Sequence, residues 1–222
     1  MKNATQSVIG DFDMPQPIHY SHHIHYEFTP KALLGRPKLA AHMAVVSAMW
    51  NEIEARIGAL LAALVGAAEA ETVISIFLAV KNDAARRATI DTVARLKMSD
   101  ADRERFQEIM RIVGKRYDER NPIVHGAWGL SPSYPGAILW ADIRETMMLH
   151  VRMMNAADDQ GSEIRLAYQR KILAYNEADF LNIEKRFEET FGELAVFSKP
   201  IMEQAFGPRL KVDLPPTLLP PG

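Results

Sequence analysis

The sequence predicts a mainly α-helical protein, a bundle of four or five helices with a small antiparallel β-hairpin or sheet inserted between the third long helix and the last one. Long stretches carry apolar residues at steps of three and four, which is the spacing of a buried helix face. A loop rich in proline and glycine follows the third predicted helix, and short apolar runs typical of strands come after it.

One main domain is expected at residues 36–207, with an arm at residues 1–35 and a proline-rich tail at residues 208–222. The arm shows no helical period, and the tail holds too many prolines to form a core. Within the domain, the β insertion is expected at about residues 131–175. A composition of 48% hydrophobic and 24% charged residues fits one sizeable core.

The first long helix is expected to begin at Pro37, because proline suits the first helical turn. Its apolar stripe runs from Leu39 to Leu64, and Gly66 ends or weakens it.

A second helical stretch starts near Glu69. The pair Asn82-Asp83 interrupts its pattern, so the element is either one bent helix or two. The third helix is expected to begin after Ser99, which forms a capping-box pattern with Asp102.

The insertion is interpreted as strands at residues 137–143, 147–153 and 164–175, with a turn at residues 155–162. For residues 146–154 a helix remains the alternative, because their apolar residues also fit one helical face. These apolar residues are Met147, Met148, Val151 and Met154. We prefer strands here, and packing explains the methionine cluster better than a cofactor contact does.

The last long helix is expected to follow a cap formed by Asn176 and Asp179, and its apolar residues close the bundle. Those residues are Phe180, Ile183, Phe187, Phe191, Leu194 and Phe197. Pro200 either breaks this helix or starts a short one that ends near Gly207.

The third helix leads into the run Arg120-Asn121-x-x-x-His125, which holds a permanent cation, an amide and an imidazole that can move a proton near neutral pH. Arg120 falls seven residues after Val113, so it lies on the inward stripe and needs a partner. Pro122 disfavours the helix at Asn121, so we expect a bend or restart that brings His125 back beside Arg120.

This run resembles the signature of the HEPN superfamily, in which an arginine is followed by a polar residue and then by a histidine four to six positions beyond the arginine. The resemblance implies a HEPN-like bundle and a metal-independent endoribonuclease, often a toxin or a defence effector. It also implies a homodimer in which two copies of the motif form one composite active site. Some members carry a modified tyrosine two residues after the histidine, but here Ala127 stands there.

By the same resemblance, His125 is the general acid or base, Arg120 holds the phosphate and Asn121 orients them. Lys115 and Arg116 are candidates for contacts with the RNA backbone, and a surface charge run is the alternative for these two residues. No cofactor and no metal are expected. The partners implied are RNA, a second copy of the chain and an antitoxin or other regulatory protein.

Two other arginine and histidine pairs fit the looser spacing of the motif. They are Arg36 with His42, and Arg144 with His150. Pro37 and Glu145 follow these arginines, where the family most often has Asn, Asp or His. Both pairs are therefore interpreted as structural.

Two other functional interpretations stay open. The first is a non-catalytic HEPN-like module that binds a nucleotide or a partner protein. The second is a purely structural bundle, which predicts that Arg120 pairs with a buried carboxylate and that His125 is shut off from water.

Composition narrows the remaining classes. The absence of cysteine excludes disulfides and zinc-thiolate sites, and together with the lack of a secretory signal or membrane span it favours the cytoplasm. A net charge of −2 argues against broad adhesion to nucleic acid. The arm holds His19, His22, His23 and His25, for which we prefer an exposed or packing strand, and a transition-metal site stays open as the alternative.

Overall fold

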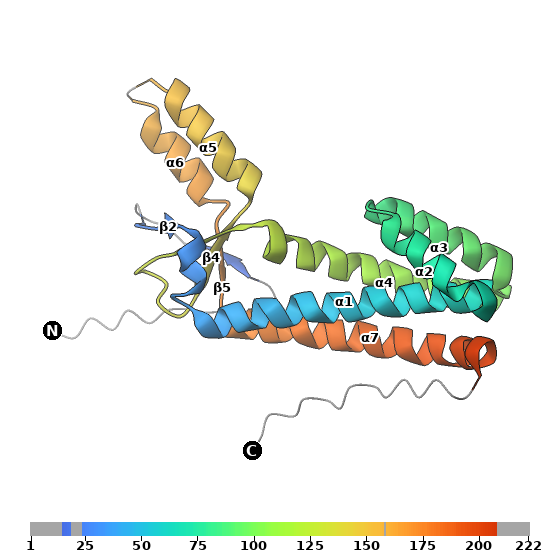
Figure 1. The fold of residues 1–222 in the computed structure, drawn as a ribbon. Coiled ribbons are helices and arrows are strands. Elements are labelled where there is room, and N and C mark those ends of the chain that lie inside the picture. Colours follow the sequence, from blue (N-terminus) through green and yellow to red (C-terminus); the bar gives the residue numbers. More distant parts are fainter. Residues whose placement is uncertain (1–14, 19–23, 158, 208–222) are drawn as a thin grey trace, which may run out of the picture. The chain divides into compact units, whose positions relative to one another are not determined.

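The computed structural model describes residues 15–18, 24–157 and 159–207, and Figure 1 shows them as helices with one small antiparallel sheet. The predicted mainly α fold class with a small sheet is therefore confirmed. The chain groups into two compact units. The sheet unit comprises Met1–Met49 and Arg116–Phe187, and the helical unit comprises Trp50–Lys115 and Glu188–Gly222.

Seven helices are present in the described ranges, and the three longest contribute residues to both units. The helices are α1 (Pro37–Val65), α2 (Ala70–Ala79), α3 (Asp83–Lys97), α4 (Asp100–His125), α5 (Ile143–Asn155), α6 (Gly161–Gln169) and α7 (Glu177–Phe206). Two short 3-10 helices, Pro30–Leu33 and Ala67–Glu69, precede α1 and α2. None of the helices in these ranges has the length and apolarity needed to cross a membrane.

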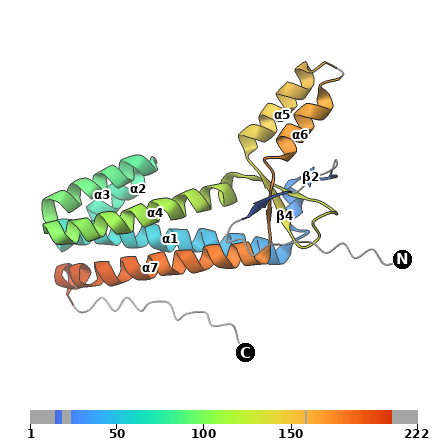
Figure 2. The same cartoon turned by 180° about the vertical axis from the view of Figure 1, so that it is seen from behind.

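The helical unit packs the apolar faces of its helices around aromatic side chains. Phe106 stacks on Phe197 with ring centroids 5.9 Å apart. The Arg86 guanidinium lies 5.3 Å from the centre of the Phe77 ring and pairs with Glu54 at 2.7 Å. Figure 2 shows α2 and α3 side by side, and this ion pair ties the second of them to α1.

Two predicted helix boundaries in this unit, at Gly66 and Ser99, are confirmed, and the alternative left open at Asn82-Asp83 is decided as two helices. Gly66 ends α1 with a φ of 128°, a conformation that favours glycine. Asn82 separates α2 from α3 as a cap, because its side chain accepts a hydrogen bond from Ala85 N at 3.0 Å. Asp102 N donates to Ser99 Oγ at 3.2 Å at the start of α4, as the capping pattern predicts.

The sheet has five short antiparallel strands in the order β1-β5-β4-β3-β2. They are β1 (Gln16–Pro17), β2 (Glu27–Phe28), β3 (Ala127–Leu130), β4 (Ile138–Ala141) and β5 (Leu173–Tyr175). β3 and β4 form a hairpin, in which Trp128 lies opposite Trp140. β4 and β5 fall within the strands expected at residues 137–143 and 164–175, whereas β3 precedes the expected insertion and was not predicted. The two described pieces of the N-terminal arm form the edge strands of this sheet. β1 pairs with β5 and β2 pairs with β3, so both pieces belong to the sheet unit.

The strands expected at residues 147–153 and 164–175 are helices α5 and α6, except for β5 at the end of the second range. Asp142 begins α5, since its side chain accepts a hydrogen bond from Arg144 N at 2.7 Å. Thr146 and Tyr168 then join the two helices by a hydrogen bond of 2.7 Å. The preferred strand interpretation was wrong because α5 and α6 pack their inner faces against each other, and short β-prone runs do not reveal such a partner.

The cap expected before α7 is confirmed, because Asp179 N donates to Asn176 Oδ1 at 3.1 Å. The expected break at Pro200 is wrong, since α7 continues to Phe206. Pro200 removes a single hydrogen bond, to the carbonyl of Val196, and Val196 is 66% exposed, so water can serve that carbonyl.

Candidate active site

The three motif residues lie at the C-terminal end of α4, in the sheet unit. Arg120 and Asn121 are half-buried, and His125, the last residue of the helix, is exposed. Arg120 Nη1 donates to Asn121 Oδ1 at 3.4 Å, a long and therefore weak hydrogen bond. The structure thus brings Arg120 and Asn121 together and leaves the imidazole on the surface.

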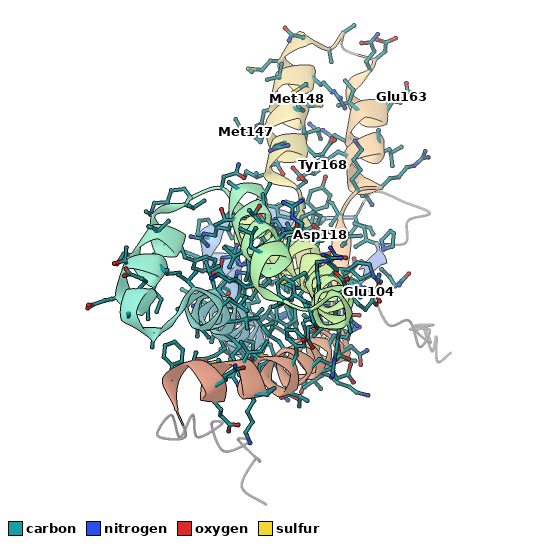
Figure 3. All side chains as sticks on the ribbon, turned by 90° about the vertical axis from the view of Figure 1, so that its right-hand side faces the viewer. Glu104, Asp118, Met147, Met148, Glu163 and Tyr168 are labelled. Atoms are coloured by element: carbon teal, nitrogen blue, oxygen red, sulfur yellow. The ribbon has the colours of Figure 1, made fainter. Side chains whose placement is uncertain are left out.

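Helix α4 runs through Pro122 without a restart, so the bend predicted at Asn121 is wrong. Pro122 removes the hydrogen bond to the carbonyl of Asp118, and Asp118 is exposed. Figure 3 labels Asp118 on α4. Only one turn follows the proline, and Gly126 N closes it by donating to Pro122 O at 2.9 Å.

Two tryptophans of the β-hairpin hold this last turn, and we call their two hydrogen bonds the indole clamp. Trp140 Nε1 donates to Pro122 O at 2.7 Å, and Trp128 Nε1 donates to Ile123 O at 3.2 Å. Both acceptors are carbonyls of the last helical turn. Pro122 O also accepts from Gly126 N, whereas Ile123 O lies where intrahelical donors run out. A Cβ at Gly126 would overlap the Trp140 indole, so only glycine allows this approach.

The continuous helix decides how the motif residues are directed. Residues four apart share a face, so Asn121 and His125 point the same way. Residues five apart differ by about 140° at 100° per residue, which separates Arg120 from His125. The expected return of His125 to the side of Arg120 required a break at Asn121, and it does not occur.

A charge cluster surrounds the start of this segment. Glu119 lies between two arginines, 3.2 Å from Arg116 Nη1 and 3.1 Å from Arg186 Nε. The contact with Arg116 is an ion pair without a well-aligned hydrogen bond. The Nε–H of Arg120 is buried and finds no acceptor in the described part of the protein. The carboxylate of Glu119 is thus shared by Arg116 and Arg186.

The two residues suggested for RNA backbone contacts lie in different environments. Lys115 is exposed and belongs to the helical unit. Arg116 is only 7% exposed and pairs with Glu119. Arg116 is therefore not part of a surface charge run. The sequence suggested that it is exposed, but its side chain lies on the inner face of α4.

Tyr175 and Asp179 lie close to this cluster and are buried. Burial raises the pKa of Tyr175, and the carboxylates of Asp179 and Glu119 raise it further, so its phenol stays protonated. Burial also raises the pKa of Asp179, against the hydrogen bond that its carboxylate accepts from Asn176 N. Both groups have structural partners, and neither is exposed enough to meet a substrate.

The other arginine and histidine pairs lie in local structural arrangements. His42 Nδ1 is 2.7 Å from Glu184 Oε1, and its ring stacks on Phe180 with centroids 6.1 Å apart. His150 Nδ1 is 2.8 Å from the carbonyl of Thr146, one turn earlier in α5. The structural interpretation of these histidines stays a prediction that substitution can test.

The structure supplies no metal site in the residues it describes, because no three His, Cys, Asp or Glu side chains gather there. His19, His22 and His23 lie outside the described residues, and of that cluster only His25 can be placed. His25 lines an open pocket of about 270 Å³ together with Glu27, Arg36, Leu130, Ser131, Pro132 and Pro135. This pocket does not include the motif residues.

The purely structural interpretation made two predictions about this site. It required His125 to be shut off from water, yet His125 is exposed. It required a buried carboxylate on Arg120, yet within the described ranges Arg120 bonds to the amide of Asn121 and Arg116 takes the carboxylate. Neither prediction is met.

Comparison with models of protein families, with curated proteins and with solved structures finds no match for this chain. The resemblance to the HEPN superfamily therefore rests on the motif residues and on their place at the end of a helix.

Proposed function

We propose that this protein is a metal-independent endoribonuclease of the HEPN type, a cytoplasmic toxin or defence effector that works as a homodimer. One observation carries the proposal. At the end of α4, an exposed imidazole and an arginine without a carboxylate partner stand within five residues of each other, among the residues that the structure describes. A histidine can move a proton at neutral pH, and a free guanidinium can hold a phosphate.

In the proposed reaction, the ribose 2′-oxygen attacks the adjacent phosphorus and the bond from phosphorus to the 5′-oxygen breaks. His125 takes the proton from the 2′-hydroxyl or gives one to the leaving 5′-oxygen. Arg120 stabilises the charge that develops on the phosphate, and Asn121 orients the two groups. The products are a 2′,3′-cyclic phosphate and a 5′-hydroxyl, and the internal nucleophile makes a metal unnecessary.

The direction of the side chains favours a site built from two chains. Arg120 and His125 of one helix point about 140° apart. A second copy related by a two-fold axis can place its own imidazole opposite the first chain's guanidinium, because such an interface pairs each patch with itself. The indole clamp supports this arrangement, since it holds His125 at a fixed place in the last turn.

The test is cleavage of labelled RNA in excess EDTA by the wild type, His125→Ala, Arg120→Gln and His150→Ala. We expect His125→Ala to lower the rate by about 10² to 10⁴, the worth of one positioned acid-base group. His150→Ala is the matched control, an exposed histidine outside the motif, and its rate should equal that of the wild type. Mixing His125→Ala with Arg120→Gln should restore part of the activity if the site is composite.

Undiminished cutting by His125→Ala contradicts the proposal, and so does activity that EDTA abolishes and Mg²⁺ restores. Loss of activity in His150→Ala with an unchanged melting curve means that the wrong motif was chosen. A monomer across micromolar concentrations in light scattering removes the composite site.

The second candidate is a non-catalytic regulatory module that binds a partner protein. The exposed apolar face of α5 favours it, because such faces mark interaction surfaces. Absence of cutting by wild type and variants alike supports this candidate.

A further inference from the structure

Helix α5 carries a row of exposed apolar side chains on one face. The row consists of Ile143 (46% exposed), Met147 (64%), Val151 (44%) and Met154 (77%). At 100° per residue these four side chains lie within an arc of about 80°. Met148, 45% exposed, borders the row, and Figure 3 shows Met147 on the side of α5 that faces away from α6.

The opposite face of α5 already has its partners. Leu149 packs against the buried cluster of the sheet that includes Leu139 and Tyr168. Thr146 bonds to the Tyr168 hydroxyl at 2.7 Å. An amphipathic helix needs one apolar stripe to join a core, so the outer row is a second stripe that the fold does not use.

The charges of α5 are divided between the same two faces. Arg144 is exposed at one edge of the outer row, about 20° beyond Val151, and His150 is exposed at the other edge. Arg152 is also exposed, but it lies about 100° beyond Val151, on the far side of Met148. The one acidic residue of α5, Glu145, is half-buried and pairs with Lys171 at 2.8 Å. The outer face of α5 therefore joins apolar side chains to cations and presents no carboxylate of this helix.

We propose that the outer face of α5 is a docking surface for an amphipathic helix of a partner protein, one whose apolar row is bordered by Asp and Glu. Apolar positions at steps of three and four fit a helix that lies along the row. Methionine side chains adapt their shape to such a ligand. Carboxylates along its edges meet Arg144 and complement its charge.

A second copy of this chain fits the surface less well. When two α5 rows pair antiparallel about a two-fold axis, each edge meets the same edge of the other copy. A second α5 then offers no carboxylate to Arg144, because its one acidic residue, Glu145, pairs with Lys171. The proposal does not depend on ribonuclease activity, because it uses none of the motif residues.

The experiment selects displayed peptides of about 18 residues from a library with a helix-forming background and randomised surface positions. Selections run in parallel on the wild type, on Met147→Asp and on Leu34→Asp. Leu34 is the matched control, because it is an apolar residue of the sheet unit outside α5 and 78% exposed. Thermal melting of each protein shows that these exposed positions leave the fold intact.

Peptides enriched on the wild type and on Leu34→Asp should carry apolar residues at steps of three and four with an excess of Asp and Glu. Met147→Asp should enrich none of them. The strongest peptide, made synthetically, should bind at least about tenfold more weakly to Met147→Asp and to Arg144→Glu. A version with Lys in place of its acidic residues should bind Arg144→Glu better than the wild type.

Four outcomes overturn the proposal. The enriched peptides are neutral or basic, or none are enriched. Met147→Asp retains the same peptides as the wild type. The face binds phosphatidylglycerol vesicles and no peptide, which assigns it to a membrane surface. The wild type dimerises and Met147→Asp does not, which assigns the face to a second copy.

Discussion

The two ends of α4 are formed in different ways. At the N-terminus, Ser99 Oγ accepts from Asp102 N at 3.2 Å, a contact between residues three apart in the chain. At the C-terminus, Trp140 reaches back 18 residues to donate to Pro122 O. The first end was predicted from the sequence, and the second contradicts the rule for residues that precede a proline.

The two helix ends differ in the sequence separation between the residues that stabilise them. A capping box needs only local residues, so its pattern is visible in the sequence. The indole clamp needs the β-hairpin to fold back onto the helix end, which no local pattern reveals. Because the hairpin supplies donors to the last-turn carbonyls, it stabilises a turn that contains a proline.

Gly126→Ala should have the largest effect, because a Cβ there overlaps the Trp140 indole. The helix end and the hairpin must then separate, and we expect a loss of about 3 kcal/mol in the free energy of unfolding. Urea denaturation measures it. Gly136→Ala is the matched control, since nothing lies within 4 Å of its added Cβ. Equal midpoints for the two variants would show that the clamp is not needed.

Trp140→Phe should have the next largest effect. It removes the N–H donor and leaves the half-buried carbonyl of Pro122 with only the hydrogen bond from Gly126 N, at a cost of about 1 kcal/mol. If His125 is catalytic, RNA cleavage should fall as well, since the last turn loosens. A variant as stable as the wild type argues against the indole clamp as the reason that α4 passes Pro122.

Ser99→Ala should cost about 1 kcal/mol, the usual worth of an N-cap side chain. The effect should appear in urea denaturation and leave RNA cleavage unchanged, because Ser99 belongs to the helical unit and lies outside the motif. A change in cleavage at constant stability would contradict the separation of the two ends of α4.

The smallest effect on stability is expected from the ionisation of Asp179. This residue caps α7 and is buried, unlike the exposed cap at Ser99. Burial raises its pKa in the folded protein above the unfolded value. The contribution to stability is complete below about pH 4 and is lost as the pH rises through the folded pKa. Relative to Asp179→Asn, the wild type should therefore lose stability as the pH rises from about 4 to 7, which urea midpoints at several pH values can measure.

The motif illustrates what a sequence can say about a site. The residue types of Arg120, Asn121 and His125 were visible at once, and so was their place at a helix end. Their directions depend on whether the helix breaks at Pro122, and that depends on a contact with Trp140. The burial of Arg116 was equally hidden, because its partner Glu119 is also held by Arg186, which comes from a different helix.

The α5–α6 pair shows the same limit in secondary structure. Residues 147–153 fit both a strand and a helix by pattern. The helix forms because Thr146 and Tyr168 meet across the pair and because Leu149 joins the sheet core, contacts that arise only after the chain has folded back.

By itself, the sequence determined the mainly helical class, the stripe of each long helix and the local boundaries at Gly66, Ser99 and Asn176, because periodicity and capping act over a few residues. Only the tertiary structure decided that α4 and α7 pass their prolines, that residues 143–169 form two helices and that His125 remains exposed. The physical reason is that these outcomes depend on partners many residues away, whose hydrogen bonds and apolar contacts outweigh local preference.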